Sequence, residues 1–192
     1  MIDRTVVRTP WRDVVVLSGP TAQARPIVHS AWFADDGVPA ADVGRANLNA
    51  RKRQVPEITG ALSGWLDGDL SAVDDIAVDL RGPAFHVAVW QALRSIPAGS
   101  VETYGEVAGR VGAPRAARAV GTACARNRVA IFVPCHRVVS AIGLGGYGWR
   151  PDLKAALLEH EGVDVERLER RRYPGSTSSR TARRRAVRPG PR

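Results

Sequence analysis

The sequence lacks any apolar run that approaches the roughly 20 residues needed to span a bilayer, so we expect no membrane partner. Cysteine is scarce as well: the only two lie eleven positions apart, which does not fit the disulfide framework of a small secreted protein. The opening residues lack the charged-then-apolar pattern of a secretory signal. These absences favour a cytoplasmic protein with reduced thiols.

Acidic residues are absent from the C-terminal segment 170–192, which holds nine arginines. This segment accounts for the whole net charge of +9, because the preceding residues contain 19 basic and 19 acidic side chains. Within that balanced part, residues 94–137 carry seven arginines against two glutamates. This local excess of +5 indicates an anionic partner such as nucleic acid.

Three regions differ in their pattern: residues 1–83, 84–166 and 167–192. The first predicts a small α/β domain with β-rich runs, an amphipathic helix and a later extended stretch. These elements are expected at residues 14–17, 27–33, 58–66 and 71–80. The second is mainly helical and begins with one buried face from Phe85 to Ile96. The third is rich in Arg, Pro, Gly and Ser, which predicts a disordered tail that either attracts phosphates or has no specific role.

Two short helices within the second region predict a helix-turn-helix. Thr103 is placed to cap the first helix and Gly112 to end it, while Pro114 would begin the second. Apart from Arg115 and Arg118, the second helix is nearly all Ala, Gly and Thr. Such small side chains would let its backbone approach nucleic acid closely, or pack tightly against the neighbouring helix, or do both on opposite faces.

A cysteine–histidine pair, Cys135-His136, follows the apolar run 129–133. A thiol is a useful nucleophile only as thiolate, and an imidazole with a neighbouring Arg137 would lower its pKa. An isolated pair of this kind is more often a buried, structural cysteine. In an extended segment the two side chains would point to opposite sides, with a water between them. Glu161 is a candidate carboxylate that would orient the imidazole and favour its protonated form.

A glycine-rich loop over 140–149 carries two aromatic residues. Its glycine spacing matches neither a Walker nor a dinucleotide-binding motif, so we predict no phosphate-binding role for it. Aromatic residues on such a loop can hold a planar ligand such as a base, or the loop can be an ordinary connection. A final helix is predicted from about Asp152 to Glu161, with Gly162 ending it.

Together these motifs resemble the C-terminal domain of the O6-alkylguanine-DNA alkyltransferases, also called methylated-DNA–protein-cysteine methyltransferases, over residues 85–162. The matching pieces are TYGEVA at 103–108, ARAVG at 117–121, Asn127, VPCHRVV at 133–139, GY at 146–147 and LLEHEG at 157–162. Residues 65–82 resemble the family's interdomain approach. The resemblance implies a ribonuclease-H-like α/β N-terminal domain, a small sheet with a helix. It also implies a mainly α, winged-helix-like C-terminal domain with a helix-turn-helix.

The resemblance implies direct, single-turnover DNA repair. An alkyl group would pass from O6 of guanine, or O4 of thymine, in double-stranded DNA to the protein's own cysteine after base flipping. Cys135 would be the acceptor, His136 would take its proton through a water, and Glu161 would complete the relay. No cofactor is implied, because the thiolate itself accepts the group, and a monomer is expected.

The same resemblance implies DNA contacts. Arg118 would fill the space left by the flipped nucleotide, with Arg115 on the same DNA-facing helix. Tyr104 would help to rotate the 3′ phosphate and would hydrogen-bond the extruded guanine. Asn127 would tie the helix-turn-helix to the active-site strand. Tyr147 would lie on the loop that closes over the base.

Gly148 stands where family members often have serine, so a backbone N–H would replace any contact from that hydroxyl. Three other functions fit parts of the pattern: a non-catalytic sensor of alkylated DNA, a Cys-His hydrolase, and a transcription regulator. The related sensors have Trp in place of the nucleophile, which Cys135 argues against. A hydrolase would need an oxyanion hole, and none is visible in the sequence. The related regulators carry a Cys-rich zinc domain, whereas residues 1–83 contain no cysteine, so we predict no metal site.

Overall fold

The N-terminal strands form a mixed five-stranded sheet in the order β4-β1-β2-β3-β5. Its centre is an antiparallel meander of β1 (Asp3–Val7), β2 (Val14–Pro20) and β3 (Pro26–Phe33). Two short strands, β4 (Arg51–Lys52) and β5 (Ala77–Val78), pair in parallel with β1 and β3 at the edges. The charged, exposed side chains of β4 are typical of an edge that resists pairing with another chain.

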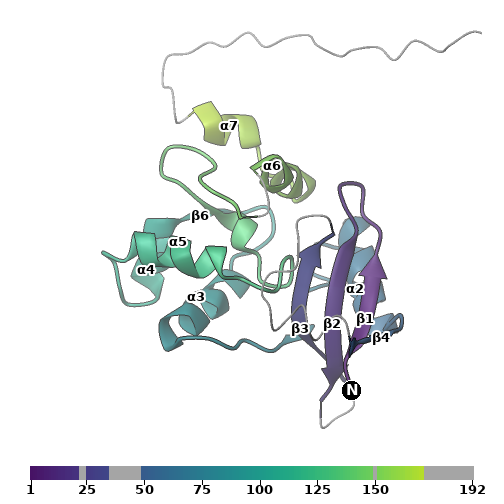
Figure 1. The fold of residues 1–192 in the computed structure, drawn as a ribbon. Coiled ribbons are helices and arrows are strands. Elements are labelled where there is room, and N and C mark those ends of the chain that lie inside the picture. Colours follow the sequence, from purple (N-terminus) through teal and green to yellow (C-terminus); the bar gives the residue numbers. More distant parts are fainter. Residues whose placement is uncertain (22–24, 35–48, 149–150, 171–192) are drawn as a thin grey trace, which may run out of the picture.

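The computed structural model describes residues 1–21, 25–34, 49–148 and 151–170. Figure 1 shows the sheet on one side of the molecule, with α3, α4 and α5 on the other. No helix in the described ranges is long and apolar enough to cross a membrane.

The sequence pattern located the two central strands but not their full extent. The first run was expected to span only residues 14–17, yet β2 continues to Pro20, with a register shift between Leu17 and Ser18. Beyond the shift, Gly19 and Pro20 pair with β3 but not with β1, so the proline lies where one side of the strand has no strand partner. The predicted extended stretch over 71–80 is wrong in most of its length, because residues 70–75 form turns and only β5 is a strand.

Helix α2 (Pro56–Leu66) confirms the amphipathic helix predicted from Ile58 onward. Proline at its first turn loses no hydrogen bond there, since the first N–H groups of a helix have no internal partner. Its buried face carries Ile58, Leu62 and Trp65 and contacts β1. The helix therefore covers one side of the N-terminal sheet.

Three helices follow: α3 (Ala84–Arg94), α4 (Tyr104–Arg110) and α5 (Ala117–Ala125). The capping prediction is confirmed, because Thr103 and Glu106 form a reciprocal capping box at the start of α4. Gly112 has a φ of 74°, the left-handed conformation in which helices commonly end. Helix α5 begins at Ala117 rather than at Pro114, since residues 113–116 form a hydrogen-bonded turn first.

Strand β6 (Glu102–Thr103) pairs in parallel with β7 (Val138–Val139). This pairing places the start of α4 beside the segment that contains the cysteine–histidine pair. Helix α6 (Pro151–His160) and the short α7 (Val165–Arg170) complete the described chain. Because α7 is helical, the predicted disordered tail is wrong for residues 167–170; its remainder lies outside the described residues.

The N-terminal and C-terminal parts share one apolar core. Its largest cluster combines sheet residues such as Val16 and Phe33 with Val89, Leu93 and Val107 from the helices. Ala31 of β3 also pairs with the segment before the cysteine: its N–H donates to Arg128 O at 2.8 Å, and its carbonyl accepts from Ala130 N at 2.9 Å. The sheet therefore holds the segment that leads into the site.

Candidate active site

The apolar run 129–133 forms no strand, and the segment with Cys135 and His136 is not extended as expected. One isolated bridge joins Val129 to Ala31, after which the chain turns, with Ile131 at a φ of 70°. A β-branched residue rarely adopts this conformation, and here it reverses a chain that is buried on all sides. The turn delivers Cys135 into a 3₁₀ helix, Cys135–Arg137. Neighbouring side chains are about 120° apart in such a helix rather than on opposite sides.

Asn127 holds the turn together from within. Its Nδ2 donates to Val133 O at 2.8 Å and to Cys135 Sγ at 3.0 Å, while its Oδ1 accepts from Val129 N at 2.9 Å. The Asn127 side chain is buried, so it contacts the thiol inside the fold and does not lie on the protein surface. Its amide fixes the position of the sulfur and offers a donor to any negative charge that develops there.

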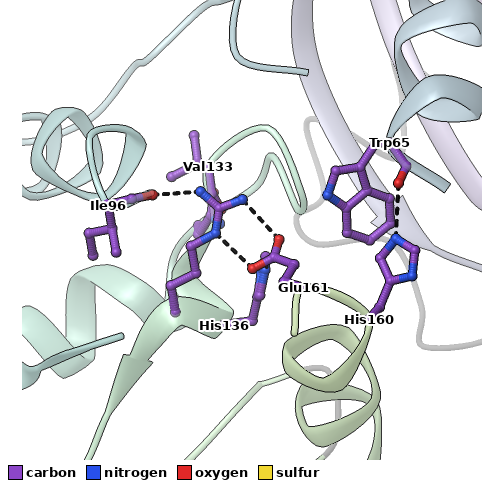
Figure 2. A network of polar contacts seen from close by, with 8 residues as sticks. Trp65, Ile96, Val133, His136, His160 and Glu161 are labelled. Carbon is purple, nitrogen blue, oxygen red and sulfur yellow. Dashed lines mark hydrogen bonds and ion pairs between the residues drawn. The ribbon is translucent and has the colours of Figure 1, made fainter. Parts of the chain in front are cut away.

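Glu161 bonds to two side chains of the 3₁₀ helix, the imidazole of His136 and the guanidinium of Arg137 (Figure 2). Its Oε1 lies 3.0 Å from His136 Nε2. Arg137 donates Nε to Oε2 at 2.9 Å and Nη2 to Oε1 at 2.8 Å, and its Nη1 donates to Ile96 O at 2.6 Å. All three side chains are at most 3% exposed. The predicted pairing of His136 with Glu161 is therefore present in the structure, and sequence reasoning missed that Arg137 completes it.

Burial and hydrogen bonding assign the charges of this cluster. Burial raises the pKa of Glu161, but hydrogen bonds from His136 and Arg137 outweigh it and lower the pKa to about 2. For His136, desolvation dominates over the attraction of Glu161, so its pKa lies below 6.5. At neutral pH the carboxylate is ionised and the imidazole is neutral. Glu161 favours the protonated form of His136, as expected, but full burial penalises the cation more strongly, so the resting imidazole is neutral.

The thiol itself is not preactivated. Burial raises the pKa of Cys135, and the hydrogen bond from Asn127 opposes that rise only in part. Arg137 was expected to lower this pKa, but its guanidinium is engaged by Glu161 and Ile96. The resting thiol is therefore protonated, and it becomes a nucleophile only when a base removes its proton. The Nδ1 atom of His136 is buried and has no hydrogen-bond partner among the described residues.

A buried lysine anchors the glycine-rich loop. Lys154 Nζ donates to Val138 O and Leu144 O, both at 2.6 Å, and to Gly146 O at 3.3 Å. Desolvation lowers the pKa of Lys154 to about 8. Gly146 O also accepts from Tyr104 Oη at 3.1 Å. Sequence reasoning missed Lys154, because a lysine in a surface helix usually points to solvent and only the loop's position reveals the carbonyls it binds.

Tyr104 lies between this loop and α5. Burial raises the pKa of its hydroxyl to about 12, so it remains a proton-bearing donor at neutral pH. Tyr147 is half-buried, and Lys154 Nζ lies 5.9 Å from the centre of its ring. Gly148 is exposed, and a Cβ built on it would meet no atom within 4 Å. Trp149, the loop's second aromatic residue, lies outside the described residues.

Arg118 is exposed on the first turn of α5, whereas Arg115 is exposed in the turn before this helix and not on the helix itself, as had been expected. Along α5, Val120 and Ala123 are buried while Ala119 and Thr122 are exposed. One side of α5 therefore packs against α3 and α4 and another is exposed, while close approach of its backbone to nucleic acid stays a prediction. Within the described ranges, no group of three His, Cys, Asp or Glu side chains is placed to hold a metal ion.

Comparison with known proteins agrees with this geometry. Residues 84–163 match a family model described as 6-O-methylguanine DNA methyltransferase, DNA binding domain. Methylated-DNA–protein-cysteine methyltransferases of Mycobacterium tuberculosis and Methanosarcina acetivorans are 50% and 45% identical over 110 and 107 residues. These matches cover 53% and 55% of this chain, and 66% and 68% of the two relatives. The chain belongs to the O6-methylguanine DNA methyltransferase family.

This membership confirms the resemblance drawn from the motifs. A longer member, the bifunctional transcriptional activator/DNA repair enzyme Ada of Escherichia coli, is 44% identical over 130 residues, 67% of this chain. The chain spans 35% of Ada and 66% of the M. tuberculosis relative, so it corresponds to part of each.

Solved structures of the family show the same mixed sheet with helices. The crystal structure of M. tuberculosis O6-methylguanine methyltransferase superimposes with a TM-score of 0.70 at 32% identity, covering 84% of this chain and 93% of that one. The M. tuberculosis protein in complex with DNA gives a TM-score of 0.64 at 33% identity, covering 83% and 93%.

Proposed function

We propose that this chain repairs alkylated DNA directly, by moving an alkyl group from O6 of guanine, or O4 of thymine, onto Cys135. The observation that carries the proposal is the buried set of Cys135, His136 and Glu161. The segment with Cys135 and His136 leads into β7, which pairs with the strand β6 in front of the helix-turn-helix. Relatives named methylated-DNA–protein-cysteine methyltransferases support the proposal. Because a thioether does not revert under these conditions, each molecule acts once.

The charges of the site suit this reaction. Neutral His136 takes the thiol proton through a water at Nδ1, and the ionised Glu161 at Nε2 stabilises the imidazolium that forms. Cys135 Sγ then attacks the alkyl carbon, the carbon–oxygen bond breaks, and the base oxygen keeps the electron pair. A ring nitrogen of guanine gains a proton, so overall a proton replaces the alkyl group. Asn127 donates to the sulfur while it carries negative charge.

We assign the DNA contacts by position. The target base must leave the duplex, at a cost of a few kcal/mol, before the thiol can reach it. Arg118 at the exposed start of α5 fills the vacated space, and Arg115 approaches the backbone phosphates. Tyr104, whose hydroxyl stays protonated, donates to the extruded guanine. A family structure in complex with DNA supports DNA as the partner, and we propose that this DNA is double-stranded.

The remaining assignments extend the same proposal. Tyr147 and the backbone N–H of Gly148 close over the base, and Asn127 ties the helix-turn-helix to the nucleophile. Residues 1–83 form a ribonuclease-H-like domain, 84–166 a winged-helix-like catalytic domain, and 167–192 a tail. A cytoplasmic monomer that needs no cofactor stays our expectation, and light scattering with and without DNA tests the monomer.

Mass spectrometry after mixing the full chain with a duplex containing one methylated guanine tests the proposal. We expect a gain of one CH₂ group, located on Cys135 and absent from Cys124, at one equivalent per molecule. Cys135→Ser should bind the duplex without transfer, and Cys124→Ser is the matched control that should still accept the group. Repair by Cys135→Ser would refute the mechanism. An unmodified Cys135 in a protein that binds the lesion would instead identify a non-catalytic sensor.

A further inference from the structure

A small apolar cluster, separate from the main core, connects the glycine-rich loop to helix α7. Its buried members, which we call the α7 cluster, are Val139 of β7, Leu158 of α6, and Val165 and Leu168 of α7. Leu144 of the loop is half-buried and packs against this cluster. Ile142, in contrast, is 61% exposed, so Leu144 is the side chain through which the loop contacts the cluster.

The chain turns sharply between α6 and α7, and its sequence specifies the turn. Gly162 has a φ of 83°, its N–H donates to Glu159 O at 3.0 Å, and the N–H of Val163 donates to Leu158 O at 2.9 Å. These two bonds form the Schellman pattern that ends a helix, and the apolar contact typical of that pattern is present because Val163 packs against the cluster that contains Leu158. Glu161 lies directly before this glycine, so one turn carries both the relay carboxylate and the start of α7.

Helix α7 is short but has one apolar face. Asp164 caps it, since its Oδ1 accepts from Arg167 N at 2.8 Å. Val165 and Leu168 are buried, whereas the remaining residues of the helix are charged and exposed (Figure 1 shows α7 beside α6). A helix of this length gains little stability from its own hydrogen bonds, so its packing on the cluster holds it in place. The match to the family model ends at residue 163, and α7 therefore lies beyond the matched domain.

The glycine-rich loop is fixed at more than one point. The carbonyl of Leu144 accepts from Lys154, while its side chain packs on the α7 cluster. Tyr147, three residues later, packs against the main core, which includes Cys135. Burial raises the pKa of Cys135, and Tyr147 and Lys154 are among the groups that oppose this rise, as expected for a loop that lies beside the thiol. Leu144 is therefore held by its backbone and by its side chain, close in sequence to the tyrosine beside the nucleophile.

We propose that Val165 and Leu168 are positioning residues for the alkyl transfer: through the cluster that supports Leu144, they hold the loop where Tyr147 closes over the extruded base. This inference rests on the proposed function, because the loop position matters to the reaction only if a base enters beside it. Within the described residues, the α7 cluster includes none from α5. Helix α7 should therefore affect the reaction of bound DNA more than the binding itself.

Single-turnover alkylation of the full chain at saturating methylated duplex tests this role. Leu168→Ala should lower the rate constant about tenfold, because a small displacement of reacting groups slows a reaction steeply, while duplex affinity should change less than about twofold. Leu168→Met keeps the apolar volume and should restore the rate. Val165→Ala removes less buried surface and is the milder second variant, with a smaller loss of rate.

The matched control is Val15→Ala. Val15 is 3% exposed on β2 and belongs to a different small cluster, with Leu17 and Trp32. This variant should lose stability in urea denaturation, as Val165→Ala does, but should alkylate at the original rate. An equal loss of rate in Val15→Ala and Val165→Ala would overturn the proposal, because the effect would then follow from lower stability alone.

Labelling with iodoacetamide tests the loop position without any alkyl transfer from DNA. Loosening the loop should raise the labelling rate of Cys135 at least about threefold in Leu168→Ala, since access limits the reaction of a buried thiol. Cys124 in the same molecule should label at an unchanged rate, and mass spectrometry distinguishes the two sites. A Cys135 that methylated duplex leaves unmodified in the original chain would refute the proposed function, whereas labelling of Cys135 unchanged by Leu168→Ala would overturn the role of α7.

Discussion

Among the residues that support the nucleophile, Glu161 has the largest predicted effect, because it holds both His136 and the buried Arg137. Glu161→Gln removes the charge that orients the imidazole and leaves Arg137 without an anion. We expect the single-turnover alkylation rate to fall by about 10²–10⁴-fold and the free energy of unfolding to fall by about 3–5 kcal/mol. Glu159→Gln, exposed near the end of α6 two residues before Glu161, is the matched control. Similar losses in both variants, by quenched-flow assay and urea denaturation, would contradict this role.

Two groups of the same cluster, His136 and Glu161, should both make the folded protein less stable as the pH falls. His136 and Glu161 both have folded-state pKa values below their unfolded values, so the unfolded chain binds more protons as the pH falls. Stability should therefore decrease first as the pH drops below about 6.5, from His136, and again between about 4.3 and 2, from Glu161. Urea denaturation between pH 8 and 5 measures the first phase. His136→Gln should remove that phase, and its persistence there would assign it to another group.

Lys154 anchors the glycine-rich loop, so its replacement should affect the alkylation rate more than DNA binding. Lys154→Met keeps the length of the side chain but leaves the carbonyls of Val138 and Leu144 without their donor, at about 1–3 kcal/mol for each unsatisfied group. We expect lower stability and a slower alkylation rate, with a smaller change in DNA affinity, because the loop and not α5 loses its anchor. Lys52→Met is the control, since Lys52 is exposed on β4 and is the only other lysine. Equal behaviour of the two variants would show that the loop holds without Lys154.

At the scale of elements, the glycine-rich loop contains two glycines with opposite requirements. Gly145 has a φ of 72°, and a Cβ there would lie 3.1 Å from both Ser140 N and the Tyr104 ring. Gly148 has open space around it. We therefore expect Gly145→Ala to displace the loop and slow alkylation at least about tenfold, since the strain costs about 1–3 kcal/mol, whereas Gly148→Ser should react at least as fast as the original. A fast Gly145→Ala variant would mean that the loop position is not needed.

Elements also show what the sequence could and could not predict. The capping box at Thr103, the end of α4 near Gly112 and the pairing of His136 with Glu161 were predictable, because local chemistry or a family motif restricts the residue types. The turn at Ile131 was not predictable, since an apolar β-branched run favours a strand until burial on all sides forces a reversal. The partners of Arg137 and Lys154 were hidden for a similar reason: they are carbonyls and a carboxylate that only the tertiary structure brings near.

For the whole molecule, the shared core predicts that both parts unfold together. The interface includes a ring contact at His160, whose Nε2 lies 2.9 Å from Trp65 O near the end of α2 (Figure 2). Its ring centre is 4.5 Å from that of Trp65 and 5.3 Å from that of Trp11. His160 directly precedes Glu161, so this contact links the N-terminal sheet and helix to the proposed relay.

We expect a single unfolding transition, seen identically by tryptophan fluorescence and circular dichroism. His160→Ala should lower its midpoint, because about 1–3 kcal/mol of hydrogen bonding and ring contact is lost, and should also slow alkylation by loosening Glu161. Glu159→Gln, one residue earlier and exposed, serves again as the control. Two separate transitions would show that the parts are independent, and a destabilised His160→Ala with an unchanged rate would show that the contact supports the fold without positioning the relay.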